Sequence, residues 1–186
     1  MEDKAILKLD NTKDEIIRIY NEDDIYQGND TRKNMRKNNL IHRCTDIVVC
    51  NSKGEILVQK RALTKEYCPG YLDAVIGGVV QEEDMEASAK REVHEEIGID
   101  VDKTQKKLKF IDKYFFQEDI CRDWSYCYFL ELNVEEVKSI TFLDHEVDSI
   151  EWIPKDKLYE MFNDPKVKFT KGSVQTILLF KSKGII

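Results

Sequence analysis

The stretch that decides the fold spans residues 77–99 and reads GGVVQEEDMEASAKREVHEEIGI. Within it, apolar residues recur every four positions, which predicts a helix over 84–97 with a narrow apolar stripe: Met85, Ala89, Val93 and Ile97. Asp84 is suited to cap the start of this helix, because its carboxylate can accept hydrogen bonds from free backbone N–H groups. Gly98 follows the last apolar residue, where helices commonly end in a left-handed conformation. The stretch therefore predicts a helix with defined ends that packs along one side.

Strands and helices alternate on both sides of this helix. Strand-like runs are predicted at 15–20, 44–50, 55–59, 71–76, 108–116, 124–132 and 150–153, and further helices at 31–39, 154–162 and 171–181. The turn at 51–54 ends in glycine and predicts a hairpin between the two runs around it. The pattern indicates one mixed α/β domain over 14–186, preceded by a polar, loosely held segment at 1–13.

Composition and charge argue against several classes of protein. The chain has 186 residues with 36 acidic and 29 basic side chains, a net charge of −7, so we expect no nucleic-acid partner, because such binding depends on neutralising phosphates. No apolar run is long enough to cross a membrane, and the first residues do not resemble a secretion signal. We therefore expect no membrane partner and a cytoplasmic location. The five cysteines form no CxxC pair and are expected to be reduced thiols, and His42 is expected to be a hydrogen-bonded structural residue.

Three glutamates carry the clearest chemical signal. Glu92, Glu95 and Glu96 are spaced i, i+3 and i+4, so they share one face of one helical turn. Like charges in this arrangement repel one another, and a bound cation would neutralise them. Because the donors are oxygens, the pattern favours Mg²⁺, with Mn²⁺ as the alternative. The pair Gly77 and Gly78 lets the backbone approach such an ion, or a phosphate group of a substrate, closely.

These residues match every fixed position of the Nudix signature, G-x5-E-x7-R-E-U-x-E-E-x-G-U, in which U is aliphatic. The chain therefore resembles the Nudix hydrolases, and the resemblance implies an α/β/α sandwich with a mixed β-sheet. It also implies hydrolysis of a nucleoside diphosphate derivative, with three metal ligands: Glu92, Glu95 and Glu96. Arg91 and Glu83 are then structural, and Arg91 is expected to pair with carboxylates, Glu83 among them. The signature glycine is Gly77, whereas most members use the second glycine of the pair, so the loop before Glu83 is one residue shorter.

A second resemblance extends outside the signature. Segments 42–43, 57–65 and 69–73 are similar to isopentenyl-diphosphate isomerase and its hydrolase-like relatives. In the isomerases an arginine and a lysine of this region bind the diphosphate, which implies Arg61 and Lys65 as substrate-binding residues. The catalytic cysteine of the isomerases falls at Gly77, so this chain lacks it, and it also lacks the histidine that follows. His42 matches one metal-binding histidine of the isomerases, but its companions are absent. Glu146 matches an acidic position found downstream in many Nudix proteins.

The leading interpretation is a Mg²⁺-dependent hydrolase that cleaves a diphosphate linkage in a nucleoside diphosphate derivative or a similar small diphosphate. Its candidate catalytic residues are Glu92, Glu96 and Glu146, and the general base is Glu92 or Glu146. Two alternatives stay open: an isopentenyl-diphosphate isomerase-like enzyme, and a non-enzymatic Nudix-fold protein that senses a nucleotide. The missing cysteine argues against the first and the intact signature against the second. The sequence is compatible with a homodimer.

Overall fold

The structure is a computed structural model that describes residues 15–105, 107–142 and 146–186. In chain order the elements are β1 (Ile16–Tyr20), β2 (Tyr26–Thr31), α2 (Arg32–Lys37), β3 (His42–Asn51), β4 (Glu55–Arg61), β5 (Leu72–Asp73), α3 (Met85–Ile97), the 3₁₀ helix η1 (Val101–Lys103), β6 (Lys109–Glu118), β7 (Cys121–Leu132), α4 (Val134–Lys138), β8 (Val147–Pro154), α5 (Lys155–Phe162) and α6 (Lys171–Ser182). The segment at 1–13, predicted to be loosely held, lies outside the described residues. No helix in the described part is long and apolar enough to cross a membrane.

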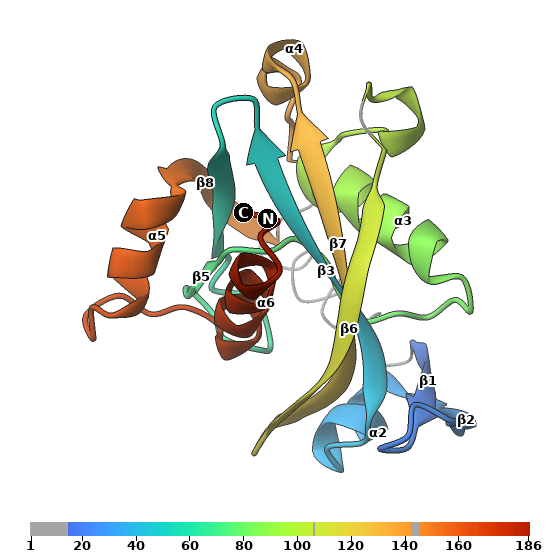
Figure 1. The fold of residues 1–186 in the computed structure, drawn as a ribbon. Helices are drawn as coiled ribbons and strands as arrows, with labels where there is room; N and C mark the ends of the chain where they lie inside the picture. The colour runs from blue at the N-terminus through green and yellow to red at the C-terminus, as the bar shows by residue number, and fades with distance from the viewer. Residues whose placement is uncertain (1–14, 106, 143–145) are drawn as a thin grey trace, which may run out of the picture.

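A six-stranded mixed sheet forms the centre of the molecule (Figure 1). Its strand order is β5-β4-β3-β7-β6, and β8 pairs with β4 off this path. β3 and β7 run parallel, with His42 opposite Asp123, whereas the other pairs in this sheet are antiparallel. The predicted hairpin of 44–50 and 55–59 is thus confirmed as β3 and β4. β1 and β2 form a separate two-stranded sheet.

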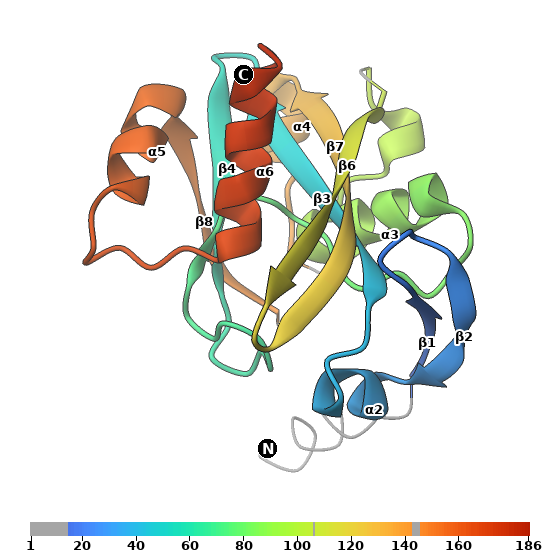
Figure 2. The same ribbon diagram turned by 60° about the horizontal axis from the view of Figure 1, so that its bottom comes forward.

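Helices cover both faces of the sheet, and each interface has its own apolar core. On one face, α3 packs on the strands through the predicted stripe, which buries Ala89, Val93 and Ile97 together with Ile47 of β3. On the other face, α5 and α6 bury Leu158, Ile177 and Phe180 together with Val48 of β3. Neighbouring residues of β3 therefore serve opposite cores, as the alternation of a strand requires. Figure 2 shows α6 lying along the sheet, on the side away from α3, and the α/β/α sandwich is confirmed.

Helix α3 begins and ends where the sequence predicts. The Asp84 carboxylate accepts hydrogen bonds from the backbone N–H groups of Glu86 at 2.9 Å and Ala87 at 3.1 Å. Gly98 has a φ of 71° in the left-handed region and ends the helix. A side chain at that position would also place its Cβ 2.2 Å from Thr141 Oγ1. Both the conformation and the packing therefore require glycine there.

Some elements differ from the prediction. β2 reads YQGNDT and lacks alternating apolar residues, so it is a strand only because it pairs along its length with β1. η1 and α4, of three and five residues, are too short to show a periodic pattern. The predicted strand at 71–76 is confined to Leu72–Asp73, because the chain then leaves β4 and Ile76 pairs with Ile47 of β3. Pairing with distant segments, not local sequence, sets these boundaries.

Replacing Asp84 with alanine should lower the free energy of unfolding by about 1 kcal/mol, because two N–H groups in the first turn of α3 lose their acceptor. Urea denaturation measures the difference. Glu83→Ala is the matched control: its side chain is 84% exposed. We expect that control to change the stability by less than about 0.5 kcal/mol. Equal effects of the two substitutions would contradict the capping role.

Candidate active site

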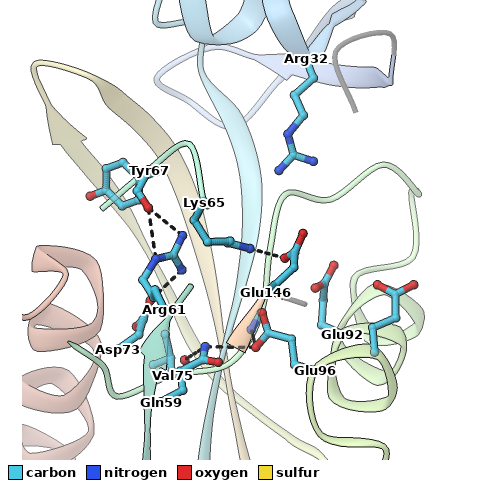
Figure 3. Close-up of polar contacts among 12 residues, drawn as sticks. Arg32, Gln59, Arg61, Lys65, Tyr67, Asp73, Val75, Glu92, Glu96 and Glu146 are labelled. Carbon is cyan, nitrogen blue, oxygen red and sulfur yellow. Dashed lines mark hydrogen bonds and ion pairs between the residues drawn. The ribbon is translucent and has the colours of Figure 1, made fainter. Parts of the chain in front are cut away.

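Helix α3 presents the three predicted metal ligands in two environments. Glu92 and Glu96 are buried, with 8% and 2% of their surfaces exposed, whereas Glu95 is exposed. Glu96 Oε2 accepts hydrogen bonds from Gln59 Nε2 at 3.1 Å and from the Gly77 N–H at 3.3 Å (Figure 3). Groups of the protein alone therefore hold Glu96 in place, on the side of α3 that faces the sheet.

The glycine pair allows a very close approach between three segments of the chain. Gly77 has a φ of +142°, and a Cβ there would lie 1.9 Å from the carbonyl oxygen of Thr45. A Cβ on Gly78 would lie 2.9 Å from a carboxylate oxygen of Glu92. No side chain fits at position 77 without displacing β3 backbone. Both glycines line a cavity, as a role in substrate binding requires, and contact with a phosphate stays a prediction.

Glu146 reaches the same region from the chain just before β8. It forms an ion pair with Lys65, which lies in the segment after β4, and Figure 3 shows this pair beside Glu92 and Glu96. Burial raises the pKa of Glu146, but the charge and hydrogen bond of Lys65 more than offset this, so the pKa lies below its ordinary value. The structure thus brings together four residues that the sequence separates by up to 81 positions.

Burial, and to a lesser extent the neighbouring carboxylates, disfavour the charged forms of Glu92 and Glu96. Burial raises the pKa of Glu92 to about 7, Arg91 acts against this shift, and the charges of Glu95 and Glu146 add to it. Burial also raises the pKa of Glu96 well above its ordinary value, and Lys65 offsets only part of the effect. A divalent cation would relieve both the repulsion and the burial of charge. An all-oxygen donor set of this kind fits Mg²⁺ or Mn²⁺.

Arg91 crosses this cluster and links three carboxylates. Its guanidinium nitrogens lie 2.7–3.0 Å from carboxylate oxygens of Glu82, Glu92 and Glu95. The predicted structural role of Arg91 is therefore consistent with its position, since one planar group fixes acids from both the loop and the helix.

Glu83 does not take part in this arrangement. Its side chain is 84% exposed, and the cation nearest to it among the described ion pairs is Arg18, at 4.0 Å. Glu82 occupies the place expected for Glu83: it accepts from Arg91 Nε at 3.0 Å and from Ser88 Oγ at 2.6 Å. The expected pairing of Arg91 with Glu83 is wrong. The loop after the glycine pair is one residue short, so the preceding glutamate faces the helix.

A cavity of about 710 Å³ opens beside the acidic cluster. Its lining includes Glu95, Glu146 and other acidic residues, together with four basic ones: Arg32, Arg36, Arg61 and Lys65. Arg61 is largely engaged within the protein. Its Nε and Nη2 donate to the Tyr67 carbonyl at 3.1 and 2.9 Å, and its Nη1 donates to Asp73 Oδ2 at 3.1 Å. Arg61 therefore also holds the loop over the cavity, and its contact with a phosphate stays a prediction.

Three residues that belong to this region are absent from the sequence-based set. Gln59 is 2% exposed and its amide also donates to the Val75 carbonyl at 3.0 Å. In the sequence, Gln59 could have been recognised as a polar residue two positions after Leu57, on the face of β4 that packs toward α3. Arg32 extends from the predicted basic helix toward Glu146 (Figure 3). For Glu82, the only signal in the sequence is that the loop between the glycine pair and Glu83 is one residue shorter than usual.

Glu82→Gln should raise the Mg²⁺ concentration needed for half of the maximal thermal stabilisation by about tenfold, because Arg91 would lose a charged partner that orients it. Glu83→Gln is the matched control and should stay within about twofold, since that side chain touches none of the cluster. Thermal unfolding across a Mg²⁺ titration measures both. A larger effect of Glu83→Gln would restore the role that simple counting assigns to it.

Comparison with known proteins agrees with this geometry. The family model of the NUDIX domain matches residues 40–173. The Nudix hydrolase YfcD of Salmonella typhi is 32% identical over 173 residues, which cover 91% of this chain and 86% of that protein. A Nudix hydrolase of Pseudomonas aeruginosa is 36% identical over 140 residues, covering 72% of this chain and 80% of the relative.

Solved structures show the same fold. A structure from Deinococcus radiodurans superposes with a TM-score of 0.71 at 20% identity, covering 87% of this chain and 97% of that one. The NUDIX domain of Shewanella oneidensis NrtR, crystallised with ADP ribose, has a TM-score of 0.57 at 14% identity, covering 76% and 87%. With the signature helix, the buried glutamates and the domain match in agreement, the chain belongs to the Nudix hydrolase family of enzymes.

Proposed function

We propose that this protein is a Mg²⁺-dependent pyrophosphohydrolase that cleaves a diphosphate linkage in a nucleoside diphosphate derivative or a similar small diphosphate. Mn²⁺ is the alternative ion. The observation that carries the proposal is the convergence of Glu92 and Glu96 of α3 with the ion pair of Glu146 and Lys65, beside a cavity that basic residues line. We place residues 14–186 in one catalytic unit.

Glu92, Glu95 and Glu96 would hold the ion. The burial of Glu92 and Glu96, and the repulsion within the cluster, mean that the charged cluster is most stable with a cation bound. When bound, the ion supplies charge stabilisation to the phosphate oxygens of the substrate. Arg91 keeps Glu92 and Glu95 oriented, and Gln59 with the Gly77 N–H keeps Glu96 oriented.

Glu146 is our preferred general base over Glu92. Glu146 lies outside the three proposed ion ligands, and 47% of its side chain is exposed, so an attacking water can reach it. Its lowered pKa keeps the carboxylate ionised but also makes it a weaker base. Glu92 and Glu96 are catalytic in a different sense, because their carboxylates would be engaged as ligands. Lys65 and Arg61 would bind the phosphate groups of the substrate, and Gly77 and Gly78 leave room for them.

Two observations support a small diphosphate as substrate. Four basic side chains that could contact phosphate oxygens line the cavity among several acidic ones, and the cavity lies beside the acidic cluster. ADP ribose, bound in the similar Shewanella domain, is a compound of this class. The net charge of −7 continues to argue against a nucleic-acid partner.

The isomerase alternative loses support in the structure. Isomerisation of an isolated double bond needs an acid on one face of the carbon, and the position of the expected cysteine is Gly77. Any side chain there would collide with the Thr45 carbonyl, at 1.9 Å from its Cβ. Hydrolysis needs an ion, a water and a base. This chain has glutamates that could bind the ion and a further glutamate that could accept the proton of the water.

Glu96→Gln should reduce the hydrolytic rate by about a hundredfold or more, because a ligand of the ion is lost. The apo protein should fold normally, since the amide oxygen can still accept from Gln59 and the buried charge is gone. Glu86→Gln is the control: it lies on the same helix with a side chain that is 59% exposed. The rate and the thermal shift with Mg²⁺ are both measured. A folded Glu96→Gln variant with full activity would refute the assignment.

Hydrolysis and isomerisation can be separated with one panel of compounds. We expect Mg²⁺-dependent cleavage of the diphosphate linkage in ADP ribose or another nucleoside diphosphate derivative, scored by chromatography of the two products, which for ADP ribose are AMP and ribose phosphate. Isopentenyl diphosphate in deuterated water should give no deuterated dimethylallyl product, because position 77 carries no acid. Catalytic formation of that product would overturn the hydrolase proposal.

A further inference from the structure

The cavity extends beyond the glutamate cluster to the face of the sheet that α6 covers. Besides Gly77, Gly78 and Lys65, its lining includes residues from β3, β5, β7 and the start of α6. On β3, Asp46 is in phase with Val48, which packs on the α6 side. We call this part of the lining the α6 end: Asp46, Asp73, Asp123, Ser125, Thr170, Gly172 and Ser173. None of these residues belongs to the Nudix signature.

Asp46 lies in this wall with only uncharged partners. Its Oδ2 accepts a hydrogen bond from Thr176 Oγ1 of α6 at 2.7 Å, and the Tyr114 hydroxyl lies 3.4 Å away. Tyr114 is nearer to the Gly172 carbonyl oxygen, at 3.0 Å, so its proton is not committed to Asp46. All the hydrogen-bond donors to Asp46 in the described part of the chain are hydroxyl groups, so no cation neutralises it directly.

Like charges surround this carboxylate. Burial is the main cause that raises the pKa of Asp46 to about 7, and the charges of Asp123 and Asp73 add to it. Hydrogen bonds from Thr176 and Ser125 act against the shift without cancelling it. Asp46 nevertheless lines the cavity, so a bound group can reach it. A ligand that brings hydrogen-bond donors or positive charge would therefore stabilise the carboxylate.

The other two aspartates of the α6 end have cations beside them. Arg61 Nη1 donates to Asp73 Oδ2 at 3.1 Å, and Thr170 Oγ1 donates to Asp73 Oδ1 at 3.0 Å. Burial raises the pKa of Asp123 to about 6, and the charge of Arg36 opposes this shift. Three aspartates therefore face two arginines.

The remaining charged groups near the α6 end do not close this difference. The charge of Glu118 acts on Asp123, but Glu118 is itself paired with Lys171, whose Nζ lies 3.0 Å away. Burial lowers the pKa of His42 to about 3, so this ring is neutral. The N-terminus of α6 adds a partial positive charge of about half a unit. The α6 end thus keeps an excess of negative charge, and Asp46 is the aspartate that lacks a cation beside it.

A buried hydroxyl group next to Asp46 also points to a bound ligand. Thr45 precedes Asp46 on β3 and lines the cavity, and only 1% of its surface is exposed. Its Oγ1 is buried and has no hydrogen-bond partner among the described residues. Its N–H donates to the Gly78 carbonyl at 3.0 Å, so Thr45 connects the glycine pair to Asp46. Buried hydroxyl groups normally have a partner, and a ligand that passes along this wall would supply one.

We propose that Asp46 selects substrates whose non-phosphate half carries an amino group, and that this group binds at the α6 end. The inference rests on the proposed function, which places the diphosphate at the other end, beside Lys65 and the ion ligands. An amino group donates hydrogen bonds to a carboxylate and brings full or partial positive charge, whereas a carbonyl oxygen would direct a lone pair at it. A hydroxyl group would donate one hydrogen bond but leave the excess charge in place. The volume of about 710 Å³ suits a small molecule with both halves bound.

Three pairs of compounds that differ by one amino group test the proposal. ADP ribose and IDP ribose differ in the base, as do CDP-glucose and UDP-glucose, whereas UDP-glucosamine and UDP-glucose differ in the sugar. Hydrolysis with Mg²⁺ is followed by chromatography of the products. We expect the amino compound of at least one pair to have a kcat/KM about tenfold or more above that of its counterpart. The pair that responds identifies which half enters the α6 end, and equal values within all three pairs would overturn the proposal.

Binding measured without hydrolysis separates this inference from the proposed function. The same compounds are titrated into wild-type protein with a chelator in place of Mg²⁺, and calorimetry gives each Kd. A preference in Kd that depends on Asp46, with no hydrolysis of any compound, would contradict the proposed function and support this inference. Hydrolysis of both members of each pair at equal kcat/KM, with equal Kd values, would do the reverse.

Two variants and a control assign the preference to Asp46. Asp46→Asn should reduce the preference to within about twofold, mainly through a higher KM for the amino compound. Its Tm should stay equal or rise, because the amide oxygen still accepts from Thr176 and the repulsion by Asp123 is removed. Asp46→Ser needs less space and replaces it if Asp46→Asn does not fold. Asp112→Asn is the matched control, because that carboxylate pairs with Lys183 at 2.6 Å away from the cavity lining. An unchanged preference in a folded Asp46 variant would refute the assignment.

Discussion

The active-site region depends on the burial of two carboxylates, Glu92 and Glu96, against the backbone of Gly77 and Gly78. Glu92 and Glu96 lie on the inner side of α3, where loss of hydration disfavours their charge. The chain tolerates this because Gly77 and Gly78 bring backbone within reach and Gln59 supplies a donor from β4. Strand, loop and helix must therefore all be in register before the cluster can form. Its chemistry is consequently a property of the folded domain and not of the helix alone.

Strand β3 connects the two sides of the molecule. Its residues alternate between the core beneath α3 and the core beneath α6, and its parallel pairing with β7 fixes which side chains meet. Thr45 approaches Gly77 near the glutamate cluster, while Cys44, its neighbour, faces His42 and Asp123. Cys44 and Thr45, on opposite faces of this one strand, both line the cavity. A shift of its register by one residue would exchange the two sets of side chains.

The contrast between Glu82 and Glu83 shows how a signature can match by count and still differ in space. Glu83 satisfies the spacing, but Glu82 reaches Arg91 and Ser88. Either glutamate could be chosen from the sequence, because both are flexible acids in the same loop. The path of the chain from Gly78 to the capped start of α3 decides between them, and that path depends on contacts with β3.

The sequence by itself determined the mixed α/β class, the hairpin of β3 and β4, and both ends of α3, because periodicity, capping and turn chemistry are local. It also identified the Nudix family, since the whole signature lies in one continuous stretch, residues 77–99. Only the tertiary structure decided which residues from other segments join them. Lys65 and Glu146 lie 81 positions apart, and His42 and Asp123 meet through a parallel pairing that no short-range pattern encodes. In the sequence His42 lies far from Asp123, whereas the fold places the two side by side on neighbouring strands.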